Sequence, residues 1–140
     1  MTLADDVIMT IGEAARESGV TAKAIRYYES IGLIPKPVRT GGNYRAYDRR
    51  AVETLRFVHR ARSLGFAMED VQRLLSLWQD RGRKSKDVRT LAQAHLDELD
   101  AKILALESMR HAVAQLVEAC HGDHRPDCPI LLDLAKGRRA

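Results

Sequence analysis

The sequence predicts an all-α chain with one small β-hairpin, on three observations. Helix-forming residues such as Ala, Leu, Arg and Glu are abundant, while aromatic residues make up 5% of the 140 positions. Short periodic segments bounded by Gly and by capping residues recur through the first 82 residues. Residues 85–119 then contain neither Gly nor Pro, which predicts one long helix.

The first two helices are short and lie close together in the chain. In "TIGEAARESG", Thr10 and Glu13 have the spacing of a capping box, and Gly19 ends the helix. Thr21 caps a second helix over "TAKAIRYYESIG", which Gly32 ends. Two short helices joined by so tight a turn are typical of a helix-turn-helix, whose second helix enters the major groove of DNA.

The next segment predicts a β-hairpin, or wing. Prolines exclude helix in "LIPKPVRTGGNYRAYDRR", and the Gly-Gly-Asn at 41–43 suits a tight turn between two extended pieces. We interpret the basic and aromatic residues of the second helix and of the wing as DNA contacts. The arginines and the lysine would bind phosphates or base edges, and the tyrosines would pack on the DNA backbone. For each single residue the alternative is that a tyrosine packs within the protein or that a basic side chain is merely solvated. These residues are Lys23, Arg26, Tyr27, Arg39, Tyr44, Arg45 and Tyr47.

The charge distribution agrees with a polyanionic partner. Residues 1–64 hold 11 Lys and Arg against 7 Asp and Glu, whereas residues 65–140 are balanced. A basic first half beside a neutral second half indicates that one end of the molecule binds the polyanion.

Two more helices are expected before the long one. Asp48 caps a third helix that ends at Gly65, and a fourth covers "MEDVQRLLSLWQD" until Gly82 breaks it. Trp78 on the fourth helix is interpreted as a packing anchor rather than as a platform for a ligand.

The long helix carries an apolar stripe that predicts self-association. Its apolar residues recur at alternating spacings of four and three, interrupted by Arg110, as in a coiled coil. A lone helix about 50 Å long cannot bury such a stripe, so we expect a coiled coil in a homodimer. The stripe comprises Leu99, Ile103, Leu106, Val113 and Val117.

Both cysteines of the chain, Cys120 and Cys128, lie in one short loop, "ACHGDHRPDCPI", with His121 and His124. Neither a membrane-spanning stretch nor a secretory signal is evident, so we expect a cytoplasmic protein without membrane contact, in which thiols are more often free, ligands or sensors than disulfide-bonded. Two thiolates suffice for the linear coordination of Cu(I), Ag(I) or Au(I). Zinc requires four ligands and would recruit the two histidines, and a chance pair of thiols or a disulfide also stays open.

The string "TIGEAARESGVTAKAIRYYESIGLIPKPVRTGGNYRAYDRR" resembles the MerR family of bacterial transcription regulators. Within the family the chain is most similar to the CueR-type copper-efflux regulators, because seven residues separate the two loop cysteines and "DCPI" contains the second. Relatives that answer divalent metals commonly have a cysteine where this chain has Ser85. Arg89 of the partner subunit is a candidate to offset the negative charge of a metal dithiolate site, which the family builds across the dimer interface.

The resemblance implies a DNA-binding domain at 8–82 (a winged helix-turn-helix with connecting helices), a dimerisation helix at 85–119 that forms an antiparallel coiled coil, and a metal-sensing loop with a short helix at 120–140. It implies a homodimer that binds a palindromic operator in a long-spacer promoter. When Cu(I) is bound, the regulator would distort the DNA so that RNA polymerase can start transcription of copper efflux or tolerance genes. The alternatives are a Zn(II) or Cd(II) regulator with Cys and His ligands and an architectural coiled coil that ignores metals. An enzyme or metal carrier is not expected, because neither a nucleophile–base pair nor a CxxC motif is present.

Overall fold

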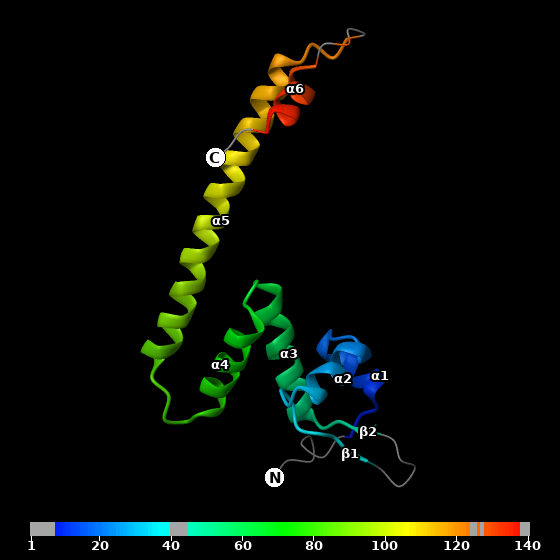
Figure 1. Cartoon of the computed structure of the whole chain (residues 1–140). Helices are drawn as coiled ribbons and strands as arrows, with labels where there is room; N and C mark the ends of the chain where they lie inside the picture. Colours follow the sequence, from blue (N-terminus) through cyan, green and yellow to red (C-terminus); the bar gives the residue numbers. More distant parts are fainter. Residues whose placement is uncertain (1–7, 40–44, 124–125, 127, 138–140) are drawn as a thin grey trace. The chain divides into compact units, whose positions relative to one another are not determined.

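The computed structural model describes residues 8–39, 45–123, 126 and 128–137. Within these residues the chain is mainly helical with one two-stranded antiparallel sheet, which confirms the predicted fold class (Figure 1). The elements are α1 (Ile11–Ser18), α2 (Ala22–Ser30), β1 (Val38–Arg39), β2 (Arg45–Ala46), α3 (Arg49–Ser63), α4 (Met68–Gln79), α5 (Ser85–Ala119) and α6 (Pro129–Lys136).

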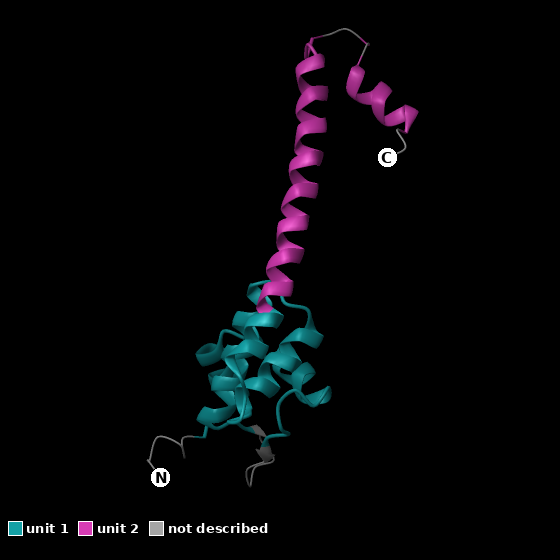
Figure 2. Ribbon diagram, turned by 90° about the vertical axis from the view of Figure 1, so that its left-hand side faces the viewer, with its two compact units in different colours: residues 1–91 teal, residues 92–140 magenta. Residues whose placement is uncertain are grey.

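The chain divides into two compact units, residues 1–91 and 92–140 (Figure 2). The first unit extends past the predicted boundary at residue 82. The first turns of α5 belong to it, where the side chains of Val88 and Leu91 are partly buried. A helix that continues from one unit into the next has no break in its sequence pattern, so the pattern alone does not show this boundary.

Side-chain caps begin the first three helices, as predicted. The Thr10 hydroxyl accepts a hydrogen bond from the Glu13 N–H at 3.2 Å and donates one to the Glu13 carboxylate at 3.1 Å. Thr21 accepts from the Ala24 N–H at 3.1 Å, and Asp48 accepts from the N–H at position 51 at 2.8 Å. Each cap satisfies a donor that the first helical turn leaves without a backbone partner.

The wing is attached to the segment that precedes α1. Strands β1 and β2 pair Val38 with Ala46 and Arg39 with Arg45. Beyond β2, the Tyr47 N–H donates to the Met9 carbonyl at 2.8 Å, and the Met9 N–H donates to the Tyr47 carbonyl at 2.7 Å. This bridge to Met9 was not predicted.

Two apolar clusters hold the first unit together, and α3 contributes to both. The first joins α1, α2, the wing and α3, and the second joins α3 and α4 with Leu33. Burying one such side chain stabilises the fold by roughly 1.5–3 kcal/mol. The buried members are Ala14, Val20, Ile25, Ile34, Tyr47, Val52 and Leu55 in the first cluster, and Leu33, Val58, Ala61, Val71 and Leu75 in the second.

Trp78 acts as a packing residue within the first unit. Its ring stacks on Phe57, with centroids 4.7 Å apart and planes 4° from parallel, and so joins α4 to α3. Part of the ring nevertheless remains exposed.

The long helix matches its predicted range, and its apolar stripe is open in the single chain. All 35 residues of α5 are described, and His95 is the only one that is buried. Ile103 is 52% exposed, and Leu106, Val113 and Val117 are exposed as well. None of the helices in the described ranges has the length and apolar character needed to span a membrane.

Candidate nucleic-acid interface and metal site

Helix α2 presents a basic and aromatic face to solvent. Lys23, Arg26, Tyr27 and Ser30 are all exposed, and their spacing of three and four residues places them along one side of the helix. Ile25 on the opposite side is fully buried in the first cluster. The predicted contact residues of α2 are therefore free to meet a flat or grooved partner.

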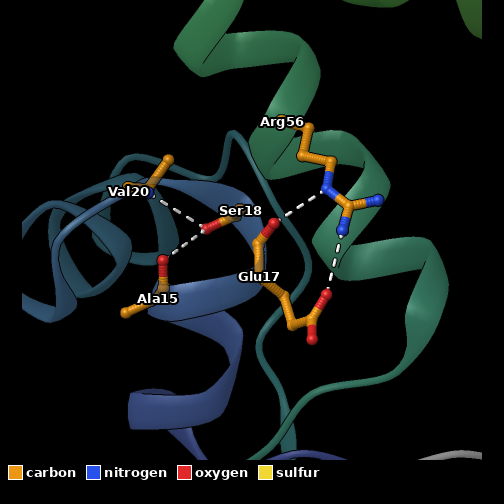
Figure 3. Close-up of polar contacts among 5 residues, drawn as sticks. All are labelled: Ala15, Glu17, Ser18, Val20 and Arg56. Carbon is orange, nitrogen blue, oxygen red and sulfur yellow. Dashed lines mark hydrogen bonds and ion pairs between the residues drawn. The ribbon is translucent and has the colours of Figure 1, made fainter.

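Figure 3 shows the turn between α1 and α2 and the contact of Arg56, on α3, with the end of α1. The Ser18 hydroxyl accepts from the Val20 N–H at 3.2 Å and closes the turn, while Gly19 takes a left-handed conformation with φ 77°. From α3, Arg56 Nε donates to the Glu17 carbonyl at 2.8 Å, and its guanidinium meets the Glu17 carboxylate at 3.1 Å. Arg56 and Glu17 thus fix the end of α1.

Tyr47 does not lie where the sequence analysis expected it. Its ring is 1% exposed and belongs to the first cluster, and its hydroxyl donates a hydrogen bond to the Glu29 carboxylate, which is also buried. The predicted contact of Tyr47 with the DNA backbone is therefore wrong in this structure, because the side chain faces the core. A signal for Glu29 was present in the sequence, since it follows Ile25 by four residues on the apolar side of α2.

The other wing residues are only partly described. Arg39 and Arg45 are paired backbone neighbours on β1 and β2, but their side chains lie outside the described part of the structure. Tyr44 lies outside the described residues altogether.

The two cysteines approach each other between α5 and α6. Cys120 directly follows α5 and donates its N–H to the Leu116 carbonyl at 3.1 Å, and Cys128 is the N-cap residue of α6. Both are free and partly buried. The Cys120 side chain lies close enough to Cys128 to help lower the pKa of its thiol, so the two side chains are neighbours.

The start of α6 favours a thiolate at Cys128. The backbone N–H of Leu131 makes the largest contribution and lowers the pKa of the Cys128 thiol below its usual value. The N–H of Ile130 and the Cys120 side chain also lower this pKa, against an opposing effect of desolvation. Helix N-termini generally stabilise negative charge in this way, and the thiolate is the form that binds metals.

The other residues considered for the metal site are two histidines of the loop and two residues near the start of α5. His121 is exposed, and His124 is outside the described residues. Ser85 and Arg89 are exposed in the first two turns of α5. In residues 8–39, 45–123, 126 and 128–137, no group of three or more His, Cys, Asp or Glu side chains is arranged to hold a metal ion. The donors that do lie together are two soft sulfur atoms, a set that fits a soft monovalent ion.

Comparisons with known proteins match nearly the whole chain. Residues 9–78 match the family described as MerR HTH family regulatory protein, and residues 52–116 match the family described as MerR, DNA binding. The HTH-type transcriptional regulator HmrR of Sinorhizobium medicae is 53% identical over 129 residues, which cover 92% of this chain and 88% of that protein. The regulator CueR of Yersinia pestis is 38% identical over 127 residues, 91% of each chain.

A solved structure has the same fold. The transcription regulator PbrR691 of Ralstonia metallidurans CH34, in complex with lead(II), superposes with a TM-score of 0.78 at 29% identity. The match covers 90% of this chain and 98% of that one.

Proposed function

Because the chain belongs to the MerR family of DNA-binding transcription regulators, and its relatives are not enzymes, we propose that it is a metal-responsive regulator that senses Cu(I) through Cys120 and Cys128. The carrying observation is that the two thiols meet at the start of α6, where the pKa of Cys128 is lowered. The names of the relatives are consistent with a response to metals, because they include the regulator HmrR, a heavy metal-dependent transcription regulator and CueR.

Operator DNA is the proposed partner of the first unit. Lys23, Arg26 and Tyr27 on the exposed face of α2 would enter the major groove, and Arg39 and Arg45 of the wing would bind the flanking phosphates. Tyr44 stays a proposed contact with the DNA backbone. Because phosphate contacts release counterions, binding would weaken steeply with salt.

A homodimer is the proposed active form. The exposed stripe of α5 needs a partner, and a second copy supplies a matching stripe. A helix of 35 residues separates its own ends by about 50 Å. Ser85 and Arg89 at one end therefore belong beside the cysteines of the other subunit, in an antiparallel pair.

Two sulfur ligands are the basis of the proposed selectivity. Cys120 and Cys128 would hold Cu(I), with Ag(I) or Au(I) as substitutes, in linear coordination of net charge minus one. Arg89 of the partner would offset that charge, and Ser85 supplies no third thiolate for a divalent ion. The apolar α6 would shield the bound ion from water.

The regulator is proposed to activate transcription without leaving its operator. The regulator would stay on an operator within a long promoter spacer and distort the DNA once metal is bound, so that RNA polymerase engages both promoter elements. Such distortion costs on the order of several kcal/mol, and metal binding must favour the distorting conformation by a comparable amount.

Transcription in vitro tests this proposal. An operator selected from random DNA is placed in a long-spacer promoter, and the full-length protein is assayed with polymerase in the presence of Cu(I) or Zn(II). We expect activation by Cu(I), none by Zn(II), and none by either metal in Cys128→Ser, which should still bind the operator. Activation by Zn(II) or Cd(II) would favour the divalent alternative, and metal-independent binding without any activation would favour the architectural one.

A further inference from the structure

A buried hydrogen bond joins the two elements that are proposed to read DNA. Tyr47, directly after β2, donates a hydrogen bond from its hydroxyl to the carboxylate of Glu29 on α2. Tyr47 is 1% exposed and Glu29 is 7% exposed, although both stand one or two residues from exposed positions. The bond spans 18 positions of the sequence and lies inside the first apolar cluster.

Filling the apolar cluster does not by itself require this hydrogen bond. A phenylalanine would fill the same volume in the cluster without a polar atom, and a carboxylate is costly to bury unless hydrogen bonds compensate it. A hydrogen bond is directional, whereas apolar contact tolerates small rotations. The pair therefore fixes the angle between α2 and the wing more narrowly than the apolar cluster alone.

We propose that Glu29 and Tyr47 are positioning residues, which hold the wing at the angle from α2 that lets both elements contact one DNA duplex at the same time. The inference rests on the proposed role of α2 and the wing in DNA binding. Neither side chain touches DNA itself, because both are buried. The Met9 backbone bridge supports the same geometry from the other side of Tyr47.

The experiment measures operator affinity in full-length variants that remove single groups. Tyr47→Phe removes one hydroxyl and leaves the ring in the core. Tyr28→Phe is the matched control, because Tyr28 is a half-buried tyrosine of α2 whose hydroxyl forms no hydrogen bond within the described residues. We expect operator affinity to fall about tenfold in Tyr47→Phe, as for the loss of one hydrogen bond to a charged group, and to stay within about twofold in Tyr28→Phe.

A mutant cycle distinguishes positioning from a loss of stability. Arg45→Ala is combined with Tyr47→Phe, and affinities are measured well below the unfolding temperature of every variant. If the bond positions the wing, Arg45→Ala should cost less affinity in the Tyr47→Phe background than in the wild type, and binding to non-operator DNA should change little. Glu29→Gln, which keeps an acceptor for the hydroxyl, should retain more affinity than Glu29→Ala.

The outcomes separate this inference from the proposed function. If Arg26→Ala leaves operator affinity unchanged, the proposed role of α2 itself fails. If Arg26→Ala weakens binding while Tyr47→Phe behaves like Tyr28→Phe, the positioning inference alone fails. Strictly additive effects of Arg45→Ala and Tyr47→Phe, with equal losses on operator and non-operator DNA, would also overturn it.

Discussion

Arg56→Ala is expected to destabilise the first unit by about 1–2 kcal/mol. The substitution removes two interactions with Glu17, the 2.8 Å hydrogen bond to its carbonyl and the 3.1 Å contact with its carboxylate. The side chains of Arg56 and Glu17 are 53% and 57% exposed, so water screens the ion pair, and we assign it only about 0.2–1 kcal/mol. The bond to the last-turn carbonyl of α1 contributes about 0.5–1.5 kcal/mol.

Urea unfolding of three variants separates the two contributions. Glu17→Gln removes the ion pair and keeps the carbonyl, so it should cost less than Arg56→Ala. Arg56→Ala in the Glu17→Gln background should still lose the carbonyl bond, and only the ion-pair part should disappear in high salt. Protein concentration is held constant, because an oligomer is stabilised by mass action.

A matched control shows whether charge alone matters. Arg60→Ala removes the same charge one helical turn further along the exposed side of α3. We expect it to change stability by less than about 0.5 kcal/mol, as is usual for surface substitutions. Equal effects of Arg56→Ala and Arg60→Ala, or no effect of Arg56→Ala beyond about 0.3 kcal/mol, would refute the reasoning.

The other predictions concern DNA, dimerisation, the α1–α2 turn and the thiols. Arg26→Ala should weaken operator binding by about 1–3 kcal/mol and flatten its salt dependence in fluorescence titrations; an unchanged slope would contradict a phosphate contact. Ile103→Asp should yield monomers in sedimentation, and a wild-type mass of one chain would contradict the coiled coil. Gly19→Ala should cost about 1–2 kcal/mol in unfolding experiments because of its positive φ, and a neutral effect would show that the turn adjusts. Since its pKa is lowered, Cys128 should be alkylated in the apo-protein at lower pH than a free cysteine, and Cys120→Ser should move that reaction towards higher pH; peptide mass spectrometry follows each site.

Local features of the fold could be predicted from sequence. Thr10, Thr21 and Asp48 cap their helices through hydrogen bonds that reach only three residues along the chain. The long helix 85–119 was predicted over its whole range because neither Gly nor Pro interrupts it. Such features depend on neighbours in sequence, so the pattern contains the necessary information.

Contacts between distant segments could not be predicted in the same way. An aromatic residue on a basic hairpin suits either the DNA-facing side or the core side, and Tyr47 was assigned to the DNA-facing side. In a short hairpin only the strand register decides which side is buried. The contact between Arg56 and Glu17 joins residues 39 positions apart, and both look like ordinary surface charges in the sequence. The proximity of Cys120 and Cys128 was predicted from the loop, but the N–H groups of α6 that face Cys128 became apparent only in the structure.

X-ray absorption at the copper edge tests the central claim most directly. The full-length protein is loaded with one equivalent of Cu(I) per chain under anaerobic conditions, with Cys128→Ser as the control. We predict two sulfur neighbours in linear geometry, no nitrogen neighbour, and loss of this spectrum in the variant. A site with three or four ligands that include histidine nitrogen, or an unchanged spectrum in Cys128→Ser, would contradict the two-thiolate sensor.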